Sequence, residues 1–289
     1  MADISARITR KSLAAKKKAA IKTLKAQNKE KIREVKIQYA SNPDRLQALE
    51  VEKEQKKNLR IQKRNARLAY NSRLPRRYTL GEDLFNSISH GIGSGLSVAA
   101  IVLLVLHAVF HAPEGQTSLY VTAFTIFGAS LFICYMMSTL YHAITPHGAR
   151  RVFSIIDHIS IYLLIGGTYT PFVLTRINGS KALAVFVVVW SVVAVLSILY
   201  AIFGARLRAF SMITYCIMGW LIITVFSLYT IDEPLSKISK IFLFAGGICY
   251  TAGGVFYIMR SHRWAHSVFH VLALAGSILH FFSVYYIIG

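Results

Sequence analysis

Long apolar runs alternate with short polar loops over the last three quarters of the chain, whereas the first quarter is almost continuously polar. Each run holds roughly 20 residues, the length that an α-helix needs to cross the hydrocarbon core of a bilayer. Asp157 is the one Asp, Glu, Lys or Arg set well inside a run. We therefore predict an all-α membrane protein, a seven-transmembrane helix bundle with spans near residues 86–110, 118–142, 154–174, 183–203, 209–230, 240–259 and 265–287.

Basic residues predict the direction of this bundle, because loops rich in Lys and Arg stay in the cytoplasm. The loops after the second, fourth and sixth runs each carry two arginines, whereas the opposite loops together have almost no net charge. Arg73, Arg76 and Arg77 stand just before the first run. No early apolar stretch leads to a cleavage site, so we expect no removed signal peptide. The prediction is a multi-pass protein of the cell membrane with its N-terminus in the cytoplasm and its C-terminus outside.

The composition points to the same class of protein. Of the 289 residues, 54% are hydrophobic and 16% are charged, and the mean hydropathy is positive, which excludes an ordinary water-soluble domain. Residues 1–77 hold 23 of the 33 Lys and Arg and 7 of the 13 acids, a net charge of +16. We therefore divide the chain into a basic cytosolic extension, 1–77, partly helical or disordered, and a membrane domain, 78–289. The three cysteines lie in apolar runs and are expected to be buried packing groups.

Three histidines and Asp157 are predicted to lie at one depth, close to the cytoplasmic surface. His142 ends the second run, Asp157 lies about one turn into the third, and His266 and His270 open the seventh. His266 and His270 are four residues apart, so they share one helix face and can bind one ion together. Because a carboxylate inside the membrane marks a functional site, the pattern favours a metal site.

Three neutral imidazoles suit Zn²⁺ and leave its fourth tetrahedral position open, as in catalytic sites, although other first-row metals accept the same ligands. Asp157 can then act as the base for a water molecule, and Ser138, one turn before His142, as a hydrogen-bond donor. A structural ion that only joins the helices is the alternative, and a fourth protein ligand would favour it. Apart from His90, the other histidines are expected to be hydrogen-bonded packing groups. They are His107, His111, His147, His158, His262 and His280.

Glu82, Asn86 and His90 recur at intervals of four residues, so they share one helix face at the cytoplasmic end of the first run. One interpretation is that they surround the metal site or face its substrate. The alternative is that Glu82, like Asp83, favours the positive end of the helix dipole, while His90 is an interfacial side chain. The sequence leaves both interpretations open.

Four motifs carry a resemblance to a known family: EDLFNSISHGIG from Glu82, STLYH from Ser138, DHISIYLLIGGTYTPF from Asp157 and HSVFHVLALAGSILHFF from His266. On these motifs the chain resembles the hemolysin III family, the bacterial branch of the progestin and adipoQ receptor (PAQR) group, which includes the adiponectin receptors. The resemblance covers about residues 80–288, and residues 1–77 lie outside it.

The resemblance implies a seven-helix, N-inside bundle with zinc bound by His142, His266 and His270, and with Asp157 and Ser138 beside the metal. Because related receptors resemble lipid-amide hydrolases of the ceramidase type, it also implies a zinc-dependent hydrolase of a lipid amide or ester. The first alternative is a receptor-like or structural protein in which zinc only ties helices together. The second is a haemolytic, pore-forming protein, which the mainly apolar outer halves of the runs disfavour.

The basic extension is rich in Ala, Lys, Gln and Arg over residues 7–70, which predicts a partly helical, solvated arm. We expect it to bind anionic lipid headgroups, and the alternative is a charged tail without a dedicated partner. The arm lacks interleaved aromatic residues and any nucleic-acid motif, so no specific nucleic-acid binding is expected.

Overall fold

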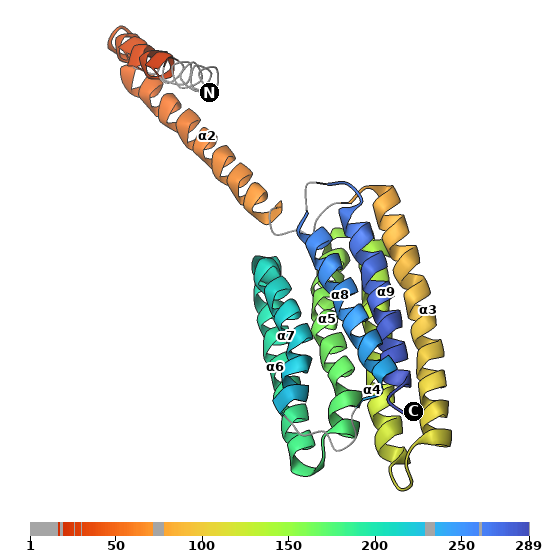
Figure 1. Cartoon of the computed structure of the whole chain (residues 1–289). Helices are drawn as coiled ribbons and strands as arrows, with labels where there is room; N and C mark the ends of the chain where they lie inside the picture. The colour runs from red at the N-terminus through yellow and green to blue at the C-terminus, as the bar shows by residue number, and fades with distance from the viewer. Residues whose placement is uncertain are drawn as a thin grey trace, which may run out of the picture. The chain divides into compact units, whose positions relative to one another are not determined.

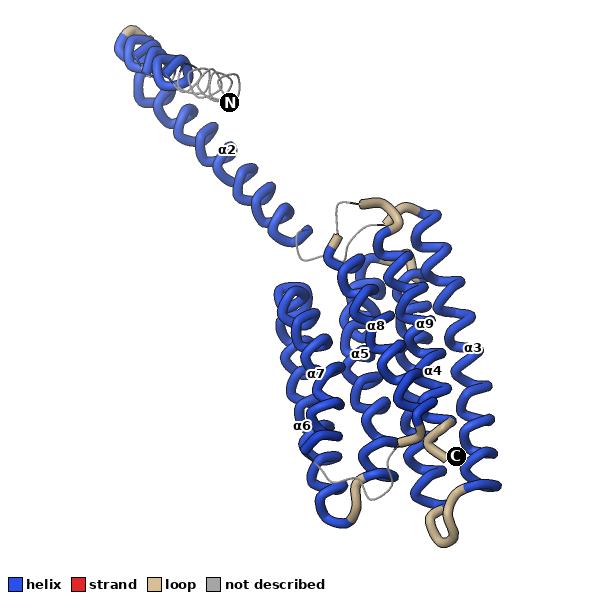
Figure 2. The backbone as a smooth tube through the Cα atoms, in the orientation of Figure 1, coloured by secondary structure: helices blue, strands red, loops and turns tan. Residues whose placement is uncertain are grey.

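The computed structural model describes residues 17, 20–25, 27–29, 31–71, 78–228, 235–259 and 262–288. All regular structure in this part of the chain is helical (Figure 1, Figure 2). The chain divides into two compact units, Met1–Ser72 and Arg73–Gly289.

The first unit is built around α2, a 29-residue helix that spans Pro43–Asn71. The Asn42 side-chain oxygen accepts a hydrogen bond of 3.1 Å from the backbone N–H of Arg45, which caps the start of the helix. Residues 31–38 are also helical, and Arg33 pairs with Glu50 at 2.8 Å. The described side chains of α2 are nearly all exposed, so little apolar surface is buried along this helix.

The second unit consists of long apolar helices. They are α3 (Leu80–His111), α4 (Thr117–Ala143), α5 (His147–Arg176), α6 (Gly179–Phe203), the short 3₁₀ helix η1 (Gly204–Leu207), α7 (Arg208–Leu228), α8 (Lys237–Ile258) and α9 (Ala265–Tyr285). By length and composition, six segments of the described chain can cross a membrane, and the fourth of them, Gly179–Val225, comprises α6, η1 and most of α7. The prediction of an all-α, multi-pass membrane protein is therefore confirmed.

α3 and α5 begin six and seven residues before the apolar runs that predicted them. α3 begins at Leu80 because Thr79 and Glu82 form a capping box, in which Thr79 Oγ1 accepts from the Glu82 N–H at 3.3 Å and the Glu82 carboxylate accepts from the Thr79 N–H at 2.9 Å. α5 begins at His147, directly after Pro146. The first turns of both helices are therefore polar, and they carry Asp83 and Arg150 towards the site described below.

α4 packs between α3 and α5, and α9 packs against both α3 and α8. α4 and α5 approach closely at Gly167, where a Cβ atom would lie 2.1 Å from Ser130 Oγ. Away from His142, the half of the bundle near the start of α4 is filled by fully buried aromatic rings of Tyr120, Phe124, Phe127 and Phe172. The outer surfaces of the helices carry many exposed large apolar side chains, as expected where lipid surrounds a protein.

Candidate metal centre

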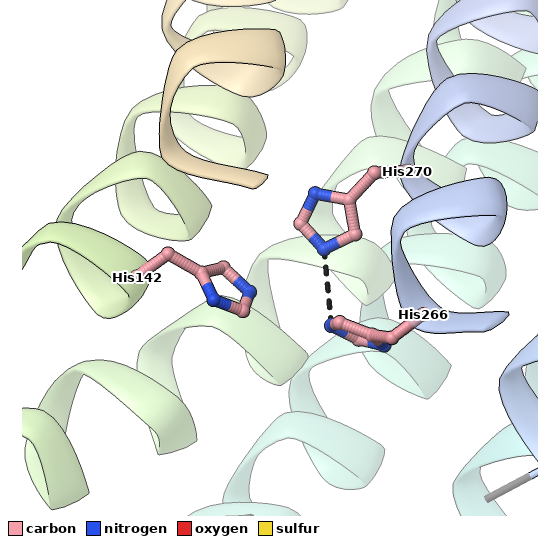
Figure 3. Close-up of side chains that lie close together, drawn as sticks. All are labelled: His142, His266 and His270. Atoms are coloured by element: carbon pink, nitrogen blue, oxygen red, sulfur yellow. Dashed lines mark hydrogen bonds between the residues drawn. The ribbon is translucent and has the colours of Figure 1, made fainter. Parts of the chain in front are cut away.

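The structure brings the rings of His142, His266 and His270 together in one buried cluster (Figure 3). His142 lies at the end of α4, and the other two lie one turn apart at the start of α9. One nitrogen atom of each ring lies within 4.8 Å of those of the other two, and His266 Nε2 and His270 Nε2 are 3.0 Å apart. All three residues are buried, with at most 6% of their surface exposed. The triad therefore places three imidazole nitrogens close together in a buried position.

The triad fits a divalent first-row cation. Zn–N bonds of about 2.0–2.1 Å in a tetrahedral site separate the ligand nitrogens by about 3.3 Å, close to the 3.0 Å between His266 and His270. His142 Nε2 is buried without a hydrogen-bond partner, and a cation would satisfy it. Among the described residues, no fourth His, Cys, Asp or Glu joins the group, so one position of a tetrahedral ion is left open by the protein.

Asp83 fixes the orientation of the His142 ring. His142 Nδ1–H donates to Asp83 Oδ1 at 2.9 Å, and Arg150 donates to both oxygens of the same carboxylate at 2.6 and 2.8 Å. The proton on Nδ1 leaves the lone pair of Nε2 directed into the cluster, an arrangement common to histidines that bind metals. The contact joins the start of α3, the end of α4 and the first turn of α5.

We expect Asp83→Asn to weaken metal binding about tenfold, because carboxylates that orient a ligating histidine contribute roughly 10–100-fold to affinity and the amide keeps the shape but loses the charge. Competition with a chromophoric chelator on detergent-purified protein measures the change. Asp44→Asn, in the first unit, is the matched control and should leave the affinity unchanged. Equal affinities of Asp83→Asn and wild type would contradict the role given to this carboxylate.

A link between the starts of α3 and α9 positions His266 and His270. Trp264, the residue before α9, has a left-handed backbone with φ of 63°, which is uncommon for a residue other than glycine. Its N–H donates to Glu82 Oε1 at 3.0 Å, while Glu82 Oε2 accepts from Thr79. One buried carboxylate therefore caps α3 and also holds the turn from which α9 begins. His266 is the second residue of α9, so this turn lies close to it.

All three residues of α3 that were predicted to surround the site are buried. Glu82, Asn86 and His90 are 5%, 0% and 4% exposed. The His90 ring stacks on His270 with 3.8 Å between ring centroids, and both polar side-chain atoms of Asn86 are buried without a hydrogen-bond partner. Glu82 caps its own helix and also accepts from the backbone of Trp264, the residue that precedes α9.

A cavity of about 360 Å³ begins at His266 and His270 and runs along the bundle. Its polar end is lined by His90, Ser138, Asp157, His266 and His270, and the rest of its wall is mainly apolar side chains of α5, α7, α8 and α9. Along α8 the lining extends from Tyr257 to Lys240, about 25 Å at 1.5 Å per residue. The cavity is therefore long, apolar for most of its length and polar at the end that holds the triad.

Asp157 and Ser138 meet in the polar wall of this cavity. The Ser138 side chain is close enough to interact with the Asp157 carboxylate, and the Asp157 side chain is 13% exposed. Asp157 is not part of the group of converging ligand atoms, so it lies beside the triad. His158, expected to be a packing group, donates through Nδ1 to the Ser154 carbonyl at 2.8 Å and accepts from the Tyr257 hydroxyl at 2.9 Å, and it also lines the cavity.

Three residues of the site were missed in the sequence. The sequence predicts a helix-dipole role for Asp83 and a topological role for Arg150. A metal-binding His142 needs an acceptor for its second nitrogen, and that need is the one signal in the sequence that points to Asp83. Tyr78 covers the triad, with its ring stacked on His266 at 4.7 Å and 5.1 Å from the ring of His142. An aromatic residue just before an apolar run carries no signal of such a role.

Comparison with known proteins places the chain among related membrane proteins. A family model described as "Haemolysin-III related" matches residues 78–281. The chain is 38% identical over 205 residues to Hemolysin-3 of Bacillus cereus, and the matched region covers 70% of this chain and 90% of that protein. It is 40% identical over 209 residues to the Hemolysin-3 homolog of Bacillus subtilis (strain 168), covering 72% and 94%. The chain is also 25% identical over 187 residues to the adiponectin receptor protein of Drosophila melanogaster. This more distant match covers 55% of this chain and 41% of that protein.

Proposed function

This chain belongs to the Haemolysin-III related family, and from that premise we propose that it is a zinc-dependent hydrolase acting on a lipid amide or ester. It is an integral membrane protein of the hemolysin III and adiponectin receptor type. The observation that carries the proposal is a buried triad of histidines at the polar end of a long apolar cavity. The triad supplies ligands for a metal, and the cavity supplies a place for an acyl chain.

The residues that would hold zinc are His142, His266 and His270. A zinc ion in such a site polarises a carbonyl group and lowers the pKa of bound water to about 7. The open fourth position supports a catalytic ion, because structural zinc sites are closed by four protein ligands. Asp83 and Arg150 would keep His142 in its ligating tautomer, and Tyr78 would shield the ring of His266 from the adjoining surface.

The cavity supports a substrate with a long hydrocarbon chain. Apolar side chains of four helices line it for most of its length, and burial of each methylene group of a chain contributes about 0.8 kcal/mol. A headgroup linkage would then lie at the polar end, next to Asp157 and Ser138. An amide or ester is the chemistry that such a polar end, with a base and a hydroxyl donor, can serve.

Asp157 would act as the general base, accepting at its carboxylate a proton from a water molecule in the polar end of the cavity. The Ser138 hydroxyl, which interacts with Asp157, would hold that carboxylate in place or donate to the oxygen on which charge develops. On α3, the His90 ring, which stacks on His270, would keep that ring in place, and the unpartnered Asn86 Oδ1 is suited to accept a hydrogen bond from a buried water.

The test is release of fatty acid by detergent-purified protein from a long-chain N-acyl amide and from a matching ester. Hydrolysis that stops on chelation and returns with added zinc supports the proposal. A receptor-like protein with a structural ion is the second candidate, favoured by the fact that the triad ties α4 to α9. It predicts that chelation lowers stability with no hydrolysis before or after. A haemolytic pore is the third, and the mainly apolar cavity wall argues against it.

We also propose seven membrane crossings, with the N-terminus and the triad on the cytoplasmic side. A single helix over Gly179–Val225, 47 residues, would be about 70 Å long, more than twice the hydrocarbon thickness of about 30 Å. Gly204, with φ of +54°, interrupts it, and in Figure 1 α6 and α7 run in opposite directions from that turn. Two crossings in this segment raise the total to seven.

Alkaline phosphatase fused after Gly289 is expected to be active, because this enzyme folds only outside the cytoplasm and seven crossings from a cytoplasmic N-terminus leave the C-terminus outside. A green fluorescent protein fused before Met1 should fluoresce in the same cells. Truncation after α8, followed by the same phosphatase, is the matched control and should be inactive. An inactive phosphatase after Gly289 would point to an even number of crossings.

A further inference from the structure

Helix α2 of the first unit gathers its positive charges on one face. Over residues 53–64 its exposed basic side chains recur at spacings of three and four residues, and at 100° per residue they fall within an arc of about 120°. They are Lys53, Lys56, Lys57, Arg60, Lys63 and Arg64. These six residues are called the basic face below.

Over residues 55–65 the opposite side of α2 is neutral. Gln55, Asn58, Gln62 and Asn65 lie there and are all exposed. The larger apolar residues of α2 do not gather into a stripe, since Leu59 and Ile61 lie on different sides of the helix at 100° per residue. The helix is therefore polarised by charge rather than by hydrophobicity, which suits contact with a negatively charged surface and not insertion among acyl chains.

Acidic residues do not offset the basic face. Glu50 pairs with Arg33 at 2.8 Å, Glu54 pairs with Lys57 at 2.8 Å, and Glu52 pairs with Lys56. These pairs are exposed, and exposed ion pairs hold their partners weakly, so Lys56 and Lys57 can exchange them for other anions. From Gln55 to Arg77 the chain has nine Lys or Arg and no acid.

The chain itself brings a bilayer within reach of the basic face. Only residues 72–79 separate the end of α2 from the start of α3, and eight residues span at most about 28 Å. A tethered surface is present at a high effective concentration, whereas a soluble polyanion must be captured from dilute solution. The basic face also lacks the interleaved aromatic side chains on which bases stack. Both arguments favour lipid over nucleic acid.

We propose that the basic face of α2 docks on anionic lipid headgroups of the membrane that holds the chain. The binding is electrostatic, and each basic residue near an anionic surface multiplies the binding constant about fivefold. The six residues together are enough to keep α2 on the surface of a membrane rich in anionic lipid. Because the Debye length falls to about 3 Å in 1 M salt, high salt should release the helix.

The full chain in nanodiscs tests this, with cleavage by a protease specific for glutamate as the readout. Glu52 and Glu54 lie beside the basic face, so docking of α2 should slow cleavage there. In discs with one third phosphatidylserine and low salt, we expect cleavage about tenfold slower than in phosphatidylcholine discs, and equal rates in both at high salt. Equal rates at low salt would overturn the proposal.

Paired variants assign the effect to the basic face. Replacement of Lys56, Lys57, Arg60, Lys63 and Arg64 by glutamine should abolish the difference between the two kinds of disc, with each variant's rate in phosphatidylcholine as its own baseline. The matched control replaces Gln55, Asn58, Gln62 and Asn65 by alanine and should keep the full difference. Circular dichroism checks that both variants keep the helix content of wild type. Loss of protection in the control alone would overturn the proposal.

Two further arms separate the lipid surface from other anions. Inorganic phosphate or a short RNA is added to wild type in phosphatidylcholine discs. Neither should slow cleavage to the rate seen with phosphatidylserine. Protection by RNA without protection by phosphatidylserine would show that the basic face binds nucleic acid. Protection by phosphate alone would show that it binds free anions. Either result overturns docking on the membrane.

Discussion

His270→Ala is expected to abolish stoichiometric metal binding. Wild-type protein purified in detergent should contain about one zinc per chain by elemental analysis, and the variant almost none. Zinc sites with a full set of ligands bind with roughly 10–16 kcal/mol, so one ligand of three contributes about 3 kcal/mol or more, over a hundredfold in affinity. Because His270 is 1% exposed, no solvent-side residue can replace its nitrogen.

His280→Ala is the matched control for this loss. His280 is a buried histidine of the same helix, hydrogen-bonded to the Leu243 carbonyl at 3.2 Å, and it lies outside the triad. Its removal should destabilise the bundle by a comparable cavity yet leave the zinc content unchanged. Wild type that folds correctly and binds no metal would remove the basis of the proposed hydrolase and leave the triad as a set of packing groups.

Asp157→Asn is expected to lower the turnover number for a lipid amide by about 10²–10⁴, the range attributed to general acid–base catalysis. The amide has nearly the shape of the carboxylate but cannot accept a proton from water at neutral pH. Zinc content should remain at the wild-type value, because Asp157 lies beside the triad and not among the converging ligand atoms. The measurement is fatty-acid release at saturating substrate alongside elemental analysis of the same preparation.

Thr168→Val controls for a change in the cavity wall. Thr168 is in the same helix and lines the same cavity, and its hydroxyl donates to the Leu164 carbonyl at 2.8 Å. Its replacement by valine therefore changes the polarity of the cavity wall but not the polar end of the cavity. Its turnover number should stay within a few-fold of wild type. If Asp157→Asn retained full turnover, the proton would have to leave by another route, and the role proposed for Asp157 would be wrong.

The helices could be predicted closely because a bilayer imposes a simple rule on sequence. Apolar runs of helix length marked every long helix of the second unit, and the errors lie where polar residues extend a helix beyond its run. α3 includes Glu82 and Asp83, and α5 includes Arg150, because caps and dipoles make polar first turns favourable. Hydropathy does not detect those turns, and they carry much of the site.

The triad could be anticipated because helix periodicity and depth are both readable along one chain. The pair at His266 and His270 follows from the period, and His142 follows from its depth. Contacts across helices are different, since rotation of one helix about its axis changes every lateral neighbour without changing any depth. The bond from Asp83 to His142 and the stacking of Tyr78 on His266 depend on such rotations, which packing of the whole bundle decides.

The link between the starts of α3 and α9 has a consequence for biosynthesis. Glu82 and Trp264 are 182 residues apart, and α9, which holds two of the three triad histidines, emerges from the ribosome well after α3 and α4. Helices made earlier enter the membrane while the carboxylate of Glu82 still lacks this partner and His142 still lacks both companions. An ion bound by all three histidines can therefore be captured only after α9 is made, and its presence would show that α9 has docked against α3 and α4.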